Sequence, residues 1–189
     1  MSKVETAFSQ YGIKQSAIKI AEAEAFKKIG CVGSLEEEME VIVIEKKCEG
    51  VVAKTRTRGS GKGELTLSLH MNYDLYVEAF GMVDAGLKTG IYAYGKDSVH
   101  KEFMFVAEVE DEDLKKKLIC YPRCIMTNGI SGSIENGAEE VAEIEITISV
   151  FADEKGKVKY EAMVSELEED LTSTWLTNFT TELVEKREE

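Results

Sequence analysis

The sequence predicts a mainly β fold: an antiparallel β-sandwich or barrel-like domain with one or two flanking α-helices and a long β-hairpin loop. Several segments alternate apolar and polar residues, a period of two that is typical of half-buried strands. Only two segments show helical spacing instead. The length of 189 residues suits one domain, so residues 1–189 are predicted to form a single unit.

The predicted strands follow one another along the chain, after an N-terminal arm and first strand within residues 1–33. The β-branched run at 39–44 indicates a strand that continues toward Cys48. The runs at 51–58 and 64–69 alternate on either side of the glycine-rich stretch 59–63, which predicts a hairpin with a flexible tip. Further strands are predicted at residues 16–24, 102–109, 117–126, 142–150 and 157–163.

Two segments are predicted to be helical. A short helix suits residues 73–80. The C-terminal segment 170–189 is predicted to be a helix that starts at Asp170 as its cap, because six apolar residues share one helical face: Leu171, Trp175, Leu176, Phe179, Leu183 and Val184. Five threonines between residues 172 and 181 oppose this prediction, since threonine has a low helix propensity.

The charge of the chain is large and unevenly distributed. A net charge of −13 argues against a protein that grips nucleic-acid phosphates, because such proteins carry a basic surface. Residues 46–63 nevertheless hold six basic residues and one acidic residue, a net charge of +5, so the other 171 residues carry −18. We therefore predict a protruding basic hairpin over residues 46–69, which can meet the acidic body of a neighbouring copy.

No catalytic, cofactor-binding or metal-binding residue is predicted, and an enzyme is not expected. The stretch 59–63 resembles a phosphate-binding loop, but a glycine and a strand follow Lys62 where that loop needs Ser or Thr and a helix. His70 and His100 have no nucleophile motif to accompany them. The acidic clusters lack the residue order of a calcium-binding loop.

The four cysteines are predicted to be free, mostly buried thiols, because their spacing does not suit zinc. Cys120 and Cys124 point to the same face if the stretch between them is extended. No apolar run approaches the length needed to span a bilayer, so no membrane partner is expected. The start of the chain lacks the apolar segment of a signal peptide, so we expect a protein that stays in the cytoplasm.

An ordered set of short segments resembles the major tail proteins, or tail tube proteins, of long-tailed, noncontractile bacteriophages of Gram-positive hosts. The resemblance runs from about residue 34 to residue 179. The order of the segments carries it: Lys47-Cys48-Glu49-Gly50, Arg58-Gly59-Ser60-Gly61-Lys62-Gly63, Leu67-Ser68-Leu69-His70-Met71, Phe80-Gly81-Met82, Ala93-Tyr94-Gly95, Cys120-Tyr121-Pro122-Arg123-Cys124, Ile134-Glu135-Asn136, the run 151–162 with Asp153, Gly156 and Tyr160, and Trp175.

The resemblance implies a structural virion protein with a tail-tube fold. Six subunits would close into a ring through their inner sheets, and stacked rings would form a hollow tube through which the genome passes into the host. Its implied partners are copies of itself, the tape measure, terminator and distal tail proteins, and double-stranded DNA in transient, non-specific passage. The implied location is the virion tail, assembled in the cytoplasm of the host bacterium, with no cofactor.

The resemblance also implies roles for particular residues. A long loop in that family reaches an adjacent subunit or ring, and the basic hairpin matches it best, so Lys54, Arg56, Arg58 and Lys62 are predicted assembly contacts. Glu143 and Glu145 are candidates for acids that face the lumen, because an acidic wall repels DNA phosphates. The alternatives are a tube subunit of a contractile tail, tailocin or secretion tube, and another virion component such as a capsid-decorating or tail-terminator protein.

Overall fold

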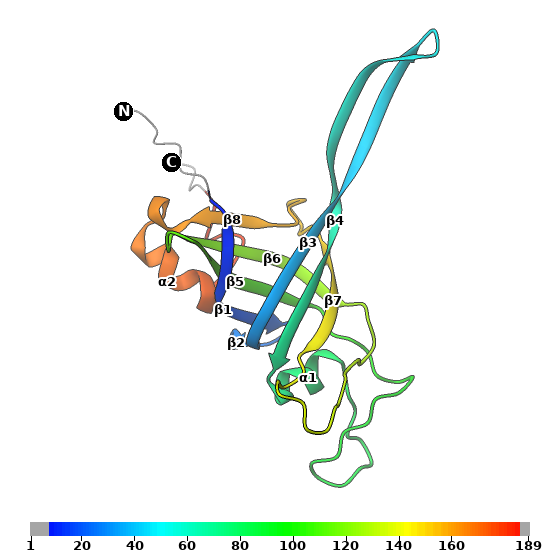
Figure 1. The fold of residues 1–189 in the computed structure, drawn as a ribbon, viewed down its shortest axis with the longest axis vertical. Coiled ribbons are helices and arrows are strands. Elements are labelled where there is room, and N and C mark those ends of the chain that lie inside the picture. The colour runs from blue at the N-terminus through cyan, green and yellow to red at the C-terminus, as the bar shows by residue number, and fades with distance from the viewer. Residues whose placement is uncertain (1–7, 186–189) are drawn as a thin grey trace.

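Figure 1 shows the computed structural model, which describes residues 8–185. The described chain forms one antiparallel sheet with the strand order β2-β1-β5-β6-β7-β4-β3, and β8 pairs separately with β6. The predicted mainly β, antiparallel fold with two α-helices is confirmed. The elements are β1 (Gln10–Ile20), β2 (Lys27–Lys28), β3 (Gly30–Cys48), β4 (Val51–Met71), α1 (Tyr73–Ala79), β5 (Phe103–Asp111), β6 (Lys116–Met126), β7 (Ile144–Phe151), β8 (Tyr160–Met163), a 3-10 helix (Val164–Glu166) and α2 (Glu169–Asn178).

The sheet curls into a barrel-like body because its two end strands are consecutive in the chain. β2 pairs with β1 and β3 pairs with β4, yet only Ile29 separates β2 from β3. The backbone N–H of Ile29 donates to the carbonyl of Ser16, which continues the link to β1. At Gly30 the chain leaves β1 and begins to pair with β4. Gly30 has a φ of 141°, and a Cβ at this position would overlap the carbonyl oxygen of His70.

The core lies inside this curved sheet. It is filled by the inward-facing side chains of the strands, which alternate along each strand with side chains that face outward. Leu65, Leu67 and Leu69 of β4 are fully buried, and they lie opposite Ile148, Ile146 and Ile144 of β7. Helix α1 contributes to the same core through Leu75 and Ala79, followed by Phe80. The strict alternation read from residues 64–69 thus predicts the inward face of β4 correctly.

A second, smaller cluster lies on the outer face of β5 and β6, where α2 packs. Trp175 and Phe179 are buried against Val106, Leu118 and Cys120. The indole Nε1–H of Trp175 donates to the carbonyl of Ile119 at 3.2 Å. The helical spacing of four residues between the two aromatic rings therefore identifies the buried face of α2.

The predicted extent and cap of the C-terminal helix are wrong. Helix α2 ends at Asn178, and Glu168, not Asp170, occupies the N-cap position without a side-chain hydrogen bond. The hydroxyls of Ser173 and Thr174 donate back to the carbonyl of Asp170, a pattern that disfavours a long helix. Residues 186–189 of the predicted helix, like residues 1–7 of the predicted N-terminal arm, lie outside the described chain.

The predicted hairpin turn is also misplaced. The glycine-rich stretch 59–63 is no tip, because β4 runs through it without interruption. The turn lies at Glu49 and Gly50, whose φ angles of 50° and 81° are those of the two-residue turns that suit right-twisted hairpins. The hairpin therefore consists of β3 and β4, and residues 64–69 of the predicted 46–69 hairpin belong to the body of the sheet.

The expectation that Cys120 and Cys124 share a face is wrong as well. In the pairing of β5 with β6, Phe105 lies opposite Tyr121 whereas Phe103 lies opposite Cys124, so β6 holds an extra residue around Pro122. This bulge turns Cys124 into the inner core and leaves Cys120 in the outer cluster. Cys31 and Cys48 are exposed, so only two of the four free thiols are buried.

Candidate assembly surfaces

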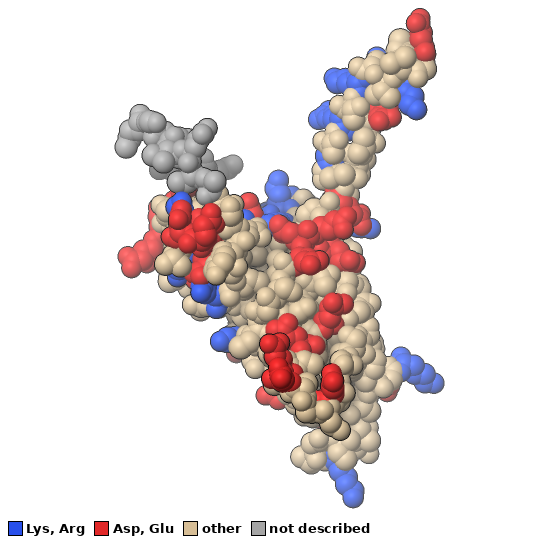
Figure 2. All heavy atoms as spheres, in the orientation of Figure 1, with Lys and Arg blue, Asp and Glu red and all other residues tan. Residues whose placement is uncertain are grey.

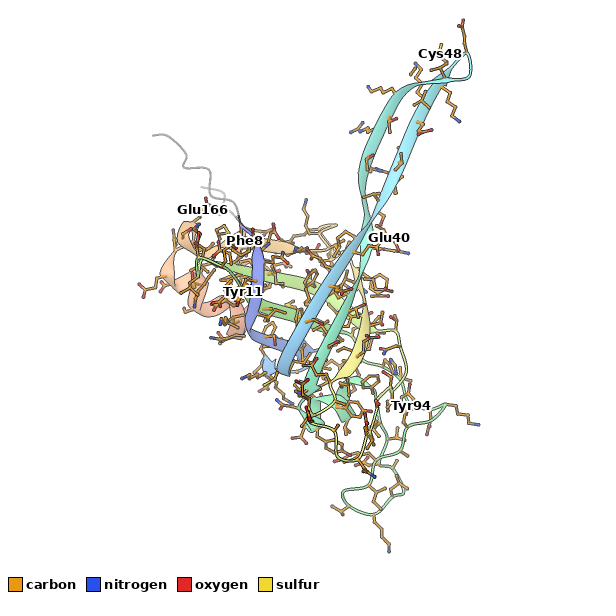
Figure 3. The ribbon with its side chains drawn as sticks, in the orientation of Figure 1. Phe8, Tyr11, Glu40, Cys48, Tyr94 and Glu166 are labelled. Atoms are coloured by element: carbon orange, nitrogen blue, oxygen red, sulfur yellow. The ribbon has the colours of Figure 1, made fainter. Side chains whose placement is uncertain are left out.

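The distal part of the β3–β4 hairpin extends beyond the sheet as a pair of strands with no third partner among residues 8–185. The pairing of β7 with β4 stops at Lys62, which lies opposite Phe151. From Val41 opposite Gly59 to the turn, β3 and β4 pair only with each other. Figures 1 and 3 show this extension leaving the body, with Glu40 at its base and Cys48 at its tip.

A bulge at the base sets the direction of the extension. Between the pairs Met39–Gly63 and Val41–Gly59, one residue of β3 faces three residues of β4. Ser60 Oγ donates to Glu40 Oε2 at 3.3 Å, and the backbone N–H of Ala152 donates to the carbonyl of Gly61 at 2.9 Å. The glycine-rich stretch therefore serves as the bend of the hairpin.

The two faces of the extension differ in chemistry. On one face, Ile42 lies opposite Arg58, Ile44 opposite Arg56, and Lys46 opposite Lys54. On the other face, Val41, Val43 and Glu45 lie opposite Gly59, Thr57 and Thr55. A row of isoleucines thus runs beside a row of three cations on the first face, which we call the basic face.

The apolar side chains of the extension are exposed to an extent unusual for their type. Val41, Ile42, Val43, Ile44, Val51 and Val52 are 39–69% exposed. A two-stranded hairpin is marginally stable alone in water, and contiguous exposed apolar side chains mark interaction surfaces. The extension therefore has the composition of a strand pair that is covered by a partner.

The cations predicted as assembly contacts are only partly brought together. Lys54, Arg56 and Arg58 share the basic face, whereas Lys62 lies apart at the base, opposite Phe151. Within residues 8–185, none of these four side chains forms an ion pair, and neither does Lys46 or Lys47. Their charges are available to a partner.

A second surface is the outward face of β3, β4 and β7, which is polar and acidic. The register places Glu38, Glu64 and Ser149 in one row, Glu36, Thr66 and Thr147 in the next, and Ser34, Ser68 and Glu145 in the third. These four glutamates are exposed, and none has a cation partner among the described residues. We call this surface the acidic face; Figure 2 shows acidic side chains gathered below the base of the hairpin.

The two acids predicted to face a lumen differ in their surroundings. Glu145 belongs to the acidic face, whereas Glu143 precedes β7 and its carboxylate lies over Gly33, where a Cβ would overlap it. Sequence reasoning missed Glu36, Glu38 and Glu64. The spacing of two between Glu36 and Glu38 was the available signal, but the pairing of β3 with β4 was needed to place Glu64 beside them.

An inward polar cluster anchors the base of the hairpin to the body. Glu37 accepts hydrogen bonds from the hydroxyl of Tyr121 and from Lys159 Nζ, the latter at 2.8 Å. Lys159 also pairs with Glu161 at 3.0 Å. Burial opposes ionisation of Glu37, but these two hydrogen bonds, together with the charges of Lys159 and Lys117, outweigh it and hold the pKa of its carboxyl below the usual value.

The turn after β7 explains the Asp153, Gly156 and Tyr160 element of the sequence. Asp153 Oδ1 accepts the backbone N–H groups of Lys155 and Lys157 at 2.9 and 2.8 Å, and Oδ2 accepts the Tyr160 hydroxyl at 2.6 Å. Gly156 has a φ of 74°, which favours glycine. This element is a structural turn that positions β8.

Three potentially reactive side chains, those of His100, Cys120 and Cys124, are hydrogen-bonded or buried within the fold. Because the Met126 carbonyl can only accept, His100 Nδ1–H donates to it at 2.8 Å, and His100 Nε2 lies 2.9 Å from the Tyr94 hydroxyl oxygen. Burial raises the pKa of both Cys120 and Cys124, which keeps these thiols protonated. Among residues 8–185 there is no group of three metal-ligating side chains and no helix long and apolar enough to cross a membrane.

Comparison with known proteins gives distant structural matches. No protein-family model and no curated protein matches the chain. The baseplate structure of the anti-feeding prophage contains a chain with a TM-score of 0.44 and 12% identity, covering 88% of this chain and 100% of that one. The tube-terminating cap of the same particle gives a TM-score of 0.40 at 12% identity, covering 87% and 100%.

A third match comes from the sheath–tube complex of an extracellular contractile injection system in the extended state. Its TM-score is 0.41 at 12% identity, covering 82% of this chain and 93% of that one. At these values the matches do not decide the family. The function is therefore inferred from the sequence and from the geometry of the hairpin.

Proposed function

We propose that this chain is the subunit of a bacteriophage tail tube, in which hexameric rings stack into a hollow conduit for genome ejection. The observation that supports this most directly is the extension of β3 and β4, with exposed apolar residues and unpaired cations on a strand pair that has no partner within the described chain. A second copy supplies both an apolar cover and opposite charge, since the rest of the chain is strongly acidic. The ordered sequence segments favour a noncontractile tail.

The acidic face suits the wall of a channel for DNA. Glu36, Glu38, Glu64 and Glu145 are interspersed with Ser and Thr, and no cation among residues 8–185 pairs with them. A uniformly negative channel wall repels the DNA phosphates and leaves the duplex mobile, whereas a basic wall binds it. We propose that this face lines the lumen, with Glu143 at its edge.

The proposed assembly fits the edges of the sheet. Within the described part of the chain, β3 pairs with β4 along one edge only, and exposed strand edges are templates for pairing with other chains. Closure into a ring gives every edge a neighbour and leaves none free. The proposed partners are other copies, the tape measure, terminator and distal tail proteins, and DNA in passage; the proposed location is the virion tail.

Electron microscopy of the concentrated purified protein tests this function. Hollow tubes with a regular ring repeat are expected. In purified particles from the source, the chain is expected in many copies per tail. Isolated monomers that turn over a small ligand would contradict the proposal, and a single ring of copies per particle would indicate a terminator instead.

A further inference from the structure

The end of the molecule opposite the hairpin carries a long acidic loop. This loop, residues 127–143, connects β6 to β7 and lies near α1 (Figure 1). It contains Glu135, Glu139 and Glu140, all exposed, and the sequence from 124 to 154 contains no Lys or Arg. None of these three glutamates forms an ion pair within the described residues.

An apolar groove lies between this loop, the end of β4 and α1. It is lined by Leu69, Met71, Tyr73, Tyr76, Ile130 and Ile134, among others. Tyr73 is 61% exposed and Ile134 is 98% exposed. Beside the groove, the loop encloses a second hollow that Ile134, Glu140 and Val141 help to line. Exposed apolar side chains and unpaired acids therefore occur together at this end.

We propose, on the basis of the proposed tube function, that this groove and loop form the socket for the β3–β4 extension of a second copy. Val51 and Val52 at the tip would be buried against the apolar groove. Arg56 and Arg58 of the basic face would pair with the glutamates of the loop. The extension and the socket are at opposite ends of the long axis, so the contact is head-to-tail and repeats from copy to copy (Figure 1).

The match of the two surfaces is both electrostatic and apolar. Residues 41–59 hold five basic and two acidic residues, a net charge of +3, whereas residues 127–143 hold four glutamates and no basic residue. The acidic face is the alternative partner for the cations. Its three rows contain only Glu, Ser and Thr, so it offers nothing against which Ile44 or Val52 can be buried. The socket therefore fits the extension better than the acidic face does.

A charge-swap experiment tests the socket. Arg56→Glu with Arg58→Glu, and separately Glu139→Lys with Glu140→Lys, are each expected to weaken association by about tenfold or more in sedimentation velocity. An equimolar mixture of the two variants is expected to associate to within about threefold of the wild type, because each reversed surface then meets its complement. A chain that carries all four substitutions is expected to associate with itself and not with the wild type.

The matched control reverses the acidic face. Glu36→Lys with Glu38→Lys changes the net charge as much as the loop variant does but leaves the socket intact, so mixing it with the hairpin reversal is not expected to restore association. If this variant, and not the loop variant, rescues the hairpin reversal, the socket is wrong and the acidic face is the partner. A wild-type chain that does not associate would overturn the proposed function itself, whereas a loop variant that assembles normally would overturn only the socket.

The exposed thiol of Cys48 at the tip allows a second, independent measurement. In a Cys31→Ser background, Ala138→Cys places a thiol in the loop, and Ser173→Cys places one on the exposed side of α2 as a control. Mild oxidation is expected to cross-link the loop variant into a ladder of species on a non-reducing gel, at least about fivefold more than the control. Equal cross-linking of the two variants would contradict the socket.

Discussion

The proximal and distal halves of the β3–β4 pair share the same kind of pairing but have opposite surroundings. In the proximal half, β4 lies between β3 and β7, and its leucines are fully buried. In the distal half, the equally apolar Val43 and Ile44 are about half exposed. The difference shows that β-branched residues favour strands in both halves. Whether the apolar side chains of a strand are buried or left exposed for a partner depends on the presence of a third strand and a core.

The largest effect is expected when the distal half is removed. Replacing residues 42–58 by Asn-Gly, a turn that joins Val41 to Gly59 across their existing pairing, should abolish tube formation in electron microscopy. The body should keep its circular dichroism spectrum and its Tm, since within residues 8–185 the strands of the extension pair only with each other. Normal tubes from this variant would contradict the role of the extension.

A pair of truncations separates stability from assembly. Leu67→Ala in the proximal half should lower the free energy of unfolding by about 3 kcal/mol, because it leaves a cavity in the core. Ile44→Ala in the distal half should change it by less than about 0.5 kcal/mol while weakening association. Urea unfolding and sedimentation velocity measure the two quantities. Similar losses of unfolding free energy in both variants would show that the distal half is packed against the body.

Removing the charge of Glu37 sharpens the comparison at the boundary between the halves. Its lowered pKa means that its hydrogen bonds stabilise the fold above the usual carboxyl pKa and are lost as the pH falls through the folded-state pKa. Glu37→Gln should therefore lower the Tm by about 2 °C at pH 7, an effect reduced by the partial exposure of the side chain. The difference from the wild type should shrink as the pH falls below the usual carboxyl pKa and vanish below the lower, folded-state pKa. A constant difference down to that pH would contradict the ionised hydrogen bonds.

Salt should produce the smallest effect. Raising NaCl from about 50 mM to about 500 mM should weaken association several-fold, because the cations of the basic face are exposed and screened. The Tm of the Asn-Gly variant, which lacks the extension, should stay nearly constant over the same range. Association that strengthens with salt would indicate that apolar burial alone holds the copies together.

Much of the local structure could be predicted from the sequence. Alternation with a period of two identified β5 and β7 to within a few residues, and the compact apolar stretch after Met71 identified α1. The hairpin turn was missed because glycine is common both in turns and in bulges. Glu49 and Gly50 form the turn through their positive φ angles, while Ser60, Gly61 and Lys62 form the bulge of β4 opposite Glu40.

The surfaces could be predicted only in part. The basic character of residues 46–62 is visible in the sequence, but which cations share a face depends on the register of β3 with β4. That register unites Arg56 with Arg58 and Lys54, and it separates them from Lys62. The acidic face joins three strands, two of which lie about 80 residues apart in the chain, so no local pattern reveals it.

By itself, the sequence determined the mainly β class, the inward face of each alternating strand, the buried face of α2 and the excess of positive charge in one hairpin. These follow from local periodicity and composition, which act over a few residues. Only the tertiary structure decided where the hairpin turns, which face each cysteine occupies and which glutamates lie together. A bulge of one residue reverses every side chain beyond it, and pairing between distant strands decides which charges become neighbours.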